Sequence, residues 1–238
     1  MGCTYLSNRK YNNIVKKKIK IVFTLSEIKF VEYKGVQYKV HNRLGHRNFL
    51  SIEFVELDDI TEIKGLDKLK NLEELILEGN NIQKIEGLHA MGNLRELKLN
   101  NNKINEIDGL DALINLEIFD LSHNNIKELM NLSRLKNLEI LYLVDNQIKN
   151  MRGFQNLKNL EELYLSRNQI EVITDLEDLI NLQDLCVACN PIKRIENYEV
   201  LINLSLLGID VKTLPEPVLT EFYSYFPRKQ SGMDDLKE

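Results

Sequence analysis

Cysteine is scarce in this chain of 238 residues, which contains three, and no apolar run approaches the length of a membrane span. Three cysteines are too few for a disulfide scaffold, so we expect a reducing location, the cytoplasm, with the nucleus as the alternative. A membrane-spanning helix needs about 18 or more apolar residues in a row. The apolar stretch 21–25 is also too short for a secretory signal and follows three lysines, so we expect no export signal.

Catalytic and metal-binding patterns are missing as well. The four histidines show no metal or triad spacing, and the chain has no glycine-rich phosphate loop. Cys186 and Cys189 form a C-x-x-C pair, but a structural zinc site needs four ligands. A redox site would place this pair at the start of a helix, whereas here it ends a strand pattern. We therefore expect no enzyme, no metal and no cofactor.

What the chain has instead is a repeat of constant length. Asparagine recurs every 22 residues in the frame L-x-x-L-x-L-x-x-N-x-I. A fixed period of this size is typical of a solenoid, in which each unit buries its apolar face against its neighbours. Six full repeats run over 71–202, and a degenerate repeat at 49–70 precedes them with Asp58 at the asparagine position. The asparagines of this column are Asn80, Asn102, Asn124, Asn146, Asn168 and Asn190.

The L-x-L part of each repeat alternates like a β-strand, with leucine inward and x outward. Successive strands would stack as a parallel sheet about 4.8 Å apart. The rest of each unit is too short for a long crossover helix and would return through 3₁₀ or short helical turns. The asparagine stands where the chain leaves the strand. Because an amide both donates and accepts, we interpret the column as a structural ladder that satisfies buried backbone groups.

This pattern resembles the 22-residue leucine-rich-repeat class typified by the nuclear regulatory subunit of type-1 protein phosphatase, with its Sds-type repeats. The resemblance covers 49–202. It implies an α/β fold, a right-handed superhelix whose concave parallel sheet binds protein. In its narrower form it implies a regulatory or scaffold subunit of a phosphatase-like enzyme. No contact residue of that class can be carried over, because the outward residues here show no residue-by-residue match.

The segment 1–48 differs from the repeats in charge. Of the chain's 31 Lys+Arg and 36 Asp+Glu, this segment holds 11 and 2, which leaves 20 and 34 for the remainder. Strand patterns at 18–25 and 28–40, with Lys34 and Gly35 as a hairpin turn, predict an antiparallel cap over the first edge of the sheet. Its lysines either face solvent there or bind anionic partners.

The last segment, 203–238, begins with a partial repeat. An amphipathic helix should follow and close the other end of the core. Beyond it, 228–238 has the composition of a tail. The residues expected on the apolar face of the helix are Val218, Leu219, Phe222, Tyr223 and Phe226.

The outward strand positions supply the candidate binding surface. Apolar side chains gather there beside glutamates, and exposed apolar clusters with a polar rim usually mark interaction sites. The alternative is that these residues merely favour strands and stack on each other without a partner. The apolar residues are Ile118, Ile140, Tyr142, Val144 and Tyr164, and the acidic ones are Glu117, Glu139, Glu161 and Glu162.

The sequence therefore predicts a monomeric, non-catalytic protein-binding module whose partner is apolar at the centre and basic at the edges. The alternative function is a membrane-surface or nucleic-acid-associated adapter that acts through the basic segment. Gly2 and Cys3 favour lipid anchoring, but Leu6 stands where the myristoylation motif needs Ser or Thr. Nucleic acid is not expected as a partner, because the lysines lack interleaved aromatic motifs.

Overall fold

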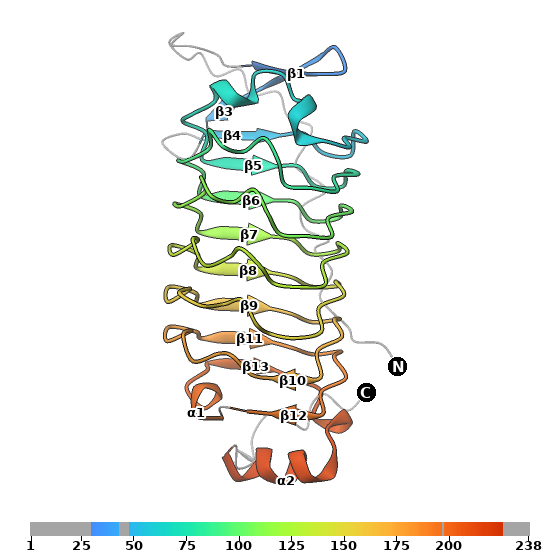
Figure 1. Ribbon diagram of the computed structural model, residues 1–238, viewed down its shortest axis with the longest axis vertical. Helices are drawn as coiled ribbons and strands as arrows, with labels where there is room; N and C mark the ends of the chain where they lie inside the picture. Colours follow the sequence, from blue (N-terminus) through green and yellow to red (C-terminus); the bar gives the residue numbers. More distant parts are fainter. Residues whose placement is uncertain (1–29, 43–47, 197, 226–238) are drawn as a thin grey trace, which may run out of the picture.

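The computed structural model describes residues 30–42, 48–196 and 198–225. These residues form a solenoid around one sheet of nine strands in the order β13-β11-β9-β8-β7-β6-β5-β4-β3 (Figure 1). Only β3 and β4 pair antiparallel; the later pairs are parallel. The strands are β3 (His41–Asn42), β4 (Asn48–Ser51), β5 (Glu74–Ile76), β6 (Glu96–Lys98), β7 (Ile118–Asp120), β8 (Ile140–Tyr142), β9 (Glu162–Tyr164), β11 (Asp184–Cys186) and β13 (Leu206–Gly208).

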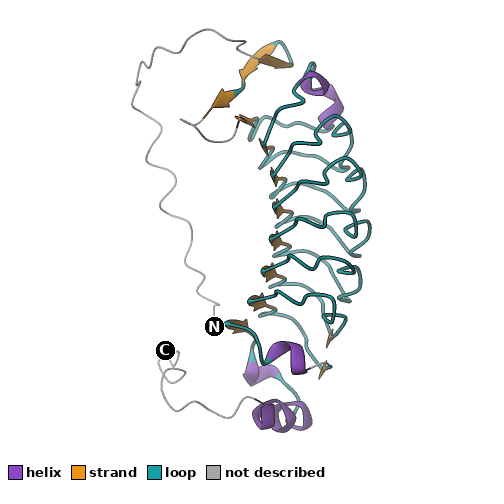
Figure 2. Ribbon diagram, turned by 90° about the vertical axis from the view of Figure 1, so that its left-hand side faces the viewer, coloured by secondary structure: helices purple, strands orange, loops and turns teal. Residues whose placement is uncertain are grey.

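The solenoid is curved, and its strands line the concave side while the returning segments form the convex side (Figure 2). The predicted fold class, a leucine-rich-repeat solenoid with a concave parallel sheet, is confirmed. The prediction of short helical turns on the return holds for the first unit, with η1 (Ile60–Glu62) and η2 (Leu66–Lys68), and for the last full repeat, with α1 (Tyr198–Leu201). Between 69 and 196 the return has turns and one pair of short parallel strands, β10 (Val172–Ile173) and β12 (Arg194–Ile195). No helix within the described ranges is long and apolar enough to cross a membrane.

The core is a continuous stack of apolar side chains that runs the length of the solenoid. The middle residue of each strand points inward and is fully buried, whereas the residues on either side of it face the concave surface. Adjacent strands pair with a shift of 22 residues, so equivalent positions form straight columns. The central buried column is Leu75, Leu97, Phe119, Leu141, Leu163 and Leu185, each with 0% exposure.

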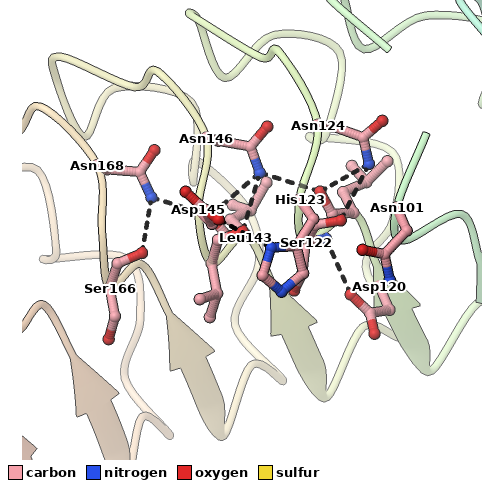
Figure 3. Close-up of polar contacts among 12 residues, drawn as sticks. Asn101, Asp120, Ser122, His123, Asn124, Leu143, Asp145, Asn146, Ser166 and Asn168 are labelled. Atoms are coloured by element: carbon pink, nitrogen blue, oxygen red, sulfur yellow. Dashed lines mark hydrogen bonds and ion pairs between the residues drawn. The ribbon is translucent and has the colours of Figure 1, made fainter. Parts of the chain in front are cut away.

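The asparagine column lies buried at the ends of the strands (Figure 3). The Nδ2 of Asn146 donates to the carbonyl oxygens of Leu143 in its own repeat (3.2 Å) and Leu121 in the preceding one (3.0 Å). Its Oδ1 accepts from the backbone N–H of Ile126 at 3.0 Å. Each ladder amide therefore links two consecutive repeats. The same pattern occurs at Asn102, Asn124, Asn168 and Asn190.

The first unit departs from the 22-residue step. Ser51 pairs with Ile76, a shift of 25 residues, and Phe54 and Glu56 adopt left-handed conformations with φ of 54° and 57°. Asn80 accordingly accepts from the backbone N–H groups of Val55 and Leu57. Asp58, expected at the asparagine position, is exposed and lies outside the ladder. That expectation is wrong because three extra residues lie between Leu57 and Ile63, where η1 is, and the sequence frame does not show them.

Both ends of the described solenoid are covered. Near the first edge, β1 (Phe30–Tyr33) and β2 (Val36–Lys39) form an antiparallel hairpin. Its turn residues Lys34 and Gly35 have φ of 47° and 77°, as a tight hairpin turn requires. Backbone hydrogen bonds between Glu32 and Lys64 attach the hairpin to the first return segment. The strand expected at 18–25 lies outside the described residues.

At the other end, α1 (Tyr198–Leu201), β13 and η3 (Val211–Thr213) lead to α2 (Glu216–Tyr225). The apolar face of α2 packs on the core through buried Phe222 and half-buried Val218, Leu219 and Tyr223. The helical cap predicted at this end is confirmed. Phe226 lies outside the described residues.

Left-handed backbone recurs at fixed places in the repeat. Gly109 has φ of 69°, and a Cβ built there would lie 1.8 Å from the carbonyl oxygen of Ile85. One repeat later, Asn131 occupies the equivalent place with φ of 62°, and its Nδ2 donates to the carbonyl oxygen of Ile107 at 2.8 Å. The site thus accepts glycine or a side chain that hydrogen-bonds the approaching carbonyl.

Replacing a ladder amide should weaken the whole stack. In Asn146→Ala the buried N–H of Ile126 loses its acceptor and the link to Leu121 is lost. We expect the free energy of unfolding to fall by about 3 kcal/mol, measured by chemical denaturation followed by circular dichroism. The matched control is Asn150→Ala, because Asn150 is exposed. It should change stability by less than about 0.5 kcal/mol. Equal losses in the two variants would contradict the ladder's role.

Substitutions at Gly109 should separate two causes of strain. Gly109→Ala places a Cβ against the Ile85 carbonyl without offering a donor, and we expect a loss of about 2 kcal/mol or more in thermal or chemical unfolding. Gly109→Asn should lose less, because the amide can donate to that carbonyl as Asn131 does one repeat later. Gly35→Ala is the control, since it has a positive φ and nothing within 4 Å of the added Cβ. A smaller loss for alanine than for asparagine at position 109 would be inconsistent with this explanation.

Candidate functional site

The outward strand positions bring the predicted apolar residues together on the concave face. Ile118 pairs in register with Ile140, and Tyr142 pairs with Tyr164. Val144 follows Tyr142 on the same repeat and also faces outward. All five side chains are half-buried, so each keeps part of its surface open to solvent. We call these five residues the apolar patch.

The two tyrosine rings are stacked. Their centroids lie 4.9 Å apart and their planes differ by 8°, which matches the spacing of about 4.8 Å between neighbouring strands. The hydroxyl of Tyr164 donates to Oε2 of Glu162 at 2.8 Å. Burial raises the pKa of Tyr164 well above its usual value, and the hydrogen bond to Glu162 adds to the effect. Burial, then the charge of Glu162, also raises the pKa of Tyr142. The rings are therefore fixed and neutral at ordinary pH.

On the N-terminal side of the patch, two basic side chains form ion pairs with carboxylates. Nζ of Lys98 lies 2.6 Å from a carboxylate oxygen of Glu96 and 3.7 Å from one of Glu74. Burial lowers the pKa of Lys98, but the hydrogen bond to Glu96 and the surrounding carboxylates outweigh it and raise that pKa overall. Glu117, predicted as a partner contact, forms an ion pair with Arg95 instead of standing free.

On the C-terminal side of the patch, carboxylates outnumber bases. Glu139 and Glu161 are exposed, and Glu162 and Asp184 are half-buried and paired in register. Within the described part of the chain, none of these four forms an ion pair with a basic side chain. We call Glu139, Glu161, Glu162 and Asp184 the acidic cluster. The sequence analysis did not select Asp184, although it follows Glu162 by one repeat and so had to lie beside it.

Two further polar contacts lie on or beside the sheet. Cys186 lies on β11 with its Sγ 3.0 Å from Oγ of Ser166, and Cys189 sits in the left-handed position that follows. Nδ1 of His123 contacts Oδ2 of Asp145 at 2.9 Å on the exposed edge of the sheet (Figure 3). Across the described residues, no three His, Cys, Asp or Glu side chains are grouped as a metal would need.

The sequence matches known repeat families over the same region. A leucine-rich repeat family matches residues 70–126, and a two-copy leucine-rich repeat family matches 114–156, 136–181 and 158–200. Together these matches cover more than half of the chain. The chain belongs to the leucine-rich repeat proteins.

Solved structures show the same architecture. An internalin, InlF, from Listeria monocytogenes is 28% identical with a TM-score of 0.53, over 68% of this chain and 53% of its own. Internalin C2 from the same organism is 25% identical with a TM-score of 0.53, over 68% of this chain and 80% of its own. TLR13 in the TLR13–ssRNA13 complex is 30% identical with a TM-score of 0.60, over 68% and 24%. The chain thus spans about half of InlF and a quarter of TLR13. No curated protein sequence matches it.

The raised tyrosine pKa values predict a loss of stability in alkali. In the unfolded chain, tyrosine releases its proton near pH of about 10. Because the folded pKa values of Tyr142 and Tyr164 are higher, stability is fully present below that pH and falls as the pH rises further. Urea unfolding midpoints between neutral and alkaline pH should show this fall. The fall in the unfolding midpoint should be smaller in Tyr142→Phe/Tyr164→Phe than in the control Tyr225→Phe. Equal falls would contradict the attribution of this pH dependence to Tyr142 and Tyr164.

Proposed function

We propose that this chain is a non-catalytic interaction module that holds a protein partner on its concave sheet, centred on Tyr142 and Tyr164. The observation that carries the proposal is the apolar patch itself. Core packing requires none of these five outward side chains to be apolar, because the core is filled from the inward positions. Tyrosine is a favoured anchor in protein interfaces, and rings that are already stacked lose little entropy on binding.

The family supports this reading, since leucine-rich repeat proteins generally act as protein-interaction modules. In its narrower form, the proposal makes the chain a regulatory or scaffold subunit of a phosphatase-like enzyme, acting as a monomer in the cytoplasm or nucleus. The narrower form rests on the 22-residue repeat frame alone. Because 331 chains of known structure match this one, the fold does not select a partner.

The second candidate function places binding on the basic segment 1–48 and on lipid attachment at Gly2 or Cys3. One of the similar structures, the TLR13–ssRNA13 complex, contains RNA. The acidic cluster makes the concave face a poor surface for a polyanion, so nucleic acid or anionic lipid would have to use the basic segment. Binding through lysines weakens steeply as salt rises, whereas binding through an apolar patch changes less.

The test is affinity capture from a lysate of the source cells, with the bound proteins identified by mass spectrometry. We expect a partner that is retained by the wild type and lost by Tyr142→Ala/Tyr164→Ala. The control is Met130→Ala/Ile180→Ala, which also removes two large apolar side chains but from positions outside the sheet, where they are 56% and 70% exposed. This control should retain the partner.

A deletion of residues 1–20 separates the two candidate functions. If the tyrosine variant keeps every partner and the deletion loses them, the concave-patch proposal is overturned and the basic segment becomes the binding element. Circular dichroism of each variant shows whether the fold is intact, so that a lost partner is not mistaken for a lost fold.

A further inference from the structure

The ion pairs on the concave face are divided unevenly between its two halves. Over β5 to β7, Lys98 pairs with Glu74 and Glu96, and Arg95 pairs with Glu117. Over β8 to β11, the acidic cluster has no such counter-charge within the described residues, and the residues between its members are apolar, aromatic or small. Arg167 follows β9 and lies in the left-handed column beyond the ends of the strands. Lys136 and Lys158, in the turns before β8 and β9, are exposed and form no ion pair with the acidic cluster. Negative charge therefore remains uncompensated where the apolar patch is.

The stacking of the tyrosines leaves one ring face available beside this charge. Since Tyr142 covers one face of Tyr164 at the strand spacing, the other face is directed along the sheet toward β11. The residue in register there is Cys186, and the next is Gly208, which has no side chain. The ring thus borders on a small side chain instead of a third ring. The carboxylates of Glu162 and Asp184 flank the same place from the neighbouring column.

An aromatic face bounded by carboxylates is the environment that binds an ammonium or guanidinium group, through attraction to the ring and to the negative charges. Lysine and arginine also carry aliphatic stems that can lie along apolar side chains such as Ile140 and Val144 while the charged end reaches a carboxylate. A small inorganic cation would gain nothing from those apolar contacts. The combination fits a cationic side chain on a polypeptide.

We propose that the β8–β11 part of the concave face binds a lysine- or arginine-bearing segment of the protein partner. One cationic side chain lies on the free face of Tyr164 between Glu162 and Asp184, and a second meets Glu139 and Glu161 at the rim. This inference rests on the proposed function and adds the chemistry of the partner to it.

The test uses the full chain and a defined probe, a short fluorescein-labelled peptide in which lysine and leucine alternate. Fluorescence anisotropy measures its affinity at ionic strengths from low to physiological, about 0.15 M. We expect binding that weakens by about fivefold or more in Glu161→Gln/Asp184→Asn, which removes two charges of the acidic cluster with little change of shape. Tyr164→Leu, which keeps an apolar side chain but removes the ring, should weaken binding by about threefold.

The matched control is Glu106→Gln/Glu128→Gln, which removes two exposed carboxylates one repeat apart on the returning segments and changes the net charge equally. It should leave the affinity within about twofold of the wild type. A second probe with glutamate in place of lysine should bind at least about tenfold more weakly, because it meets the acidic cluster with like charge. Equal binding of the two probes, or equal loss in the cluster and control variants, overturns the inference.

Failure here can be told apart from failure of the proposed function. If the probe does not discriminate but affinity capture still depends on the tyrosines, the concave face binds a partner of different chemistry. Two further outcomes would also overturn the inference that the occupant is a separate basic partner. One is sedimentation showing self-association that Glu161→Gln/Asp184→Asn abolishes, which would make a second copy the occupant. The other is probe binding only after Lys16→Gln/Lys17→Gln/Lys18→Gln, which would make the chain's own basic segment the occupant.

Discussion

The buried asparagine amide is the interaction on which the rest of the structure depends. At the end of each strand the chain turns sharply into the interior, and the backbone groups of that turn cannot reach water. One amide donates to a carbonyl of its own repeat and to a carbonyl of the preceding repeat, and it accepts from an N–H of the preceding repeat. Leaving one of these buried groups unpaired would cost more free energy of folding than one apolar contact contributes. The column therefore fixes both the geometry of each turn and the 22-residue register of the sheet.

That register separates the residues that build the protein from those that can recognise a partner. The continuous core requires leucine or a similar apolar residue at the inward positions. The turn positions are constrained by the asparagine ladder and by the left-handed backbone. The outward strand positions are not constrained in this way, which is why Ile, Lys, Asp, Tyr and Cys all occur in one column. A residue type that recurs there, as tyrosine does at 142 and 164, calls for an explanation other than packing within the solenoid.

Most of this could be predicted from the sequence, because a strict period converts spacing along the chain into proximity in space. The neighbours of Tyr142 follow from adding or subtracting 22. Prediction failed where the period fails: three extra residues between Leu57 and Ile63, where η1 lies, leave Asp58 outside the ladder. It also could not find the pairing of Lys98 with Glu74 and Glu96, since side-chain ion pairs depend on rotamers that a repeat frame does not encode.

The uneven distribution of ion pairs follows from the same separation of roles. On β5 and β6, Glu74 and Glu96 lie on neighbouring strands, but Lys98 pairs with both of them. On β9 and β11, Glu162 and Asp184 also lie on neighbouring strands and have no such basic partner among the described residues, an arrangement that destabilises the isolated fold slightly. The core and ladder are continuous enough to tolerate it. A cationic partner would relieve that repulsion, and the apolar patch would bury its open surface at the same time, so both unfavourable features of this region would be removed by one binding event.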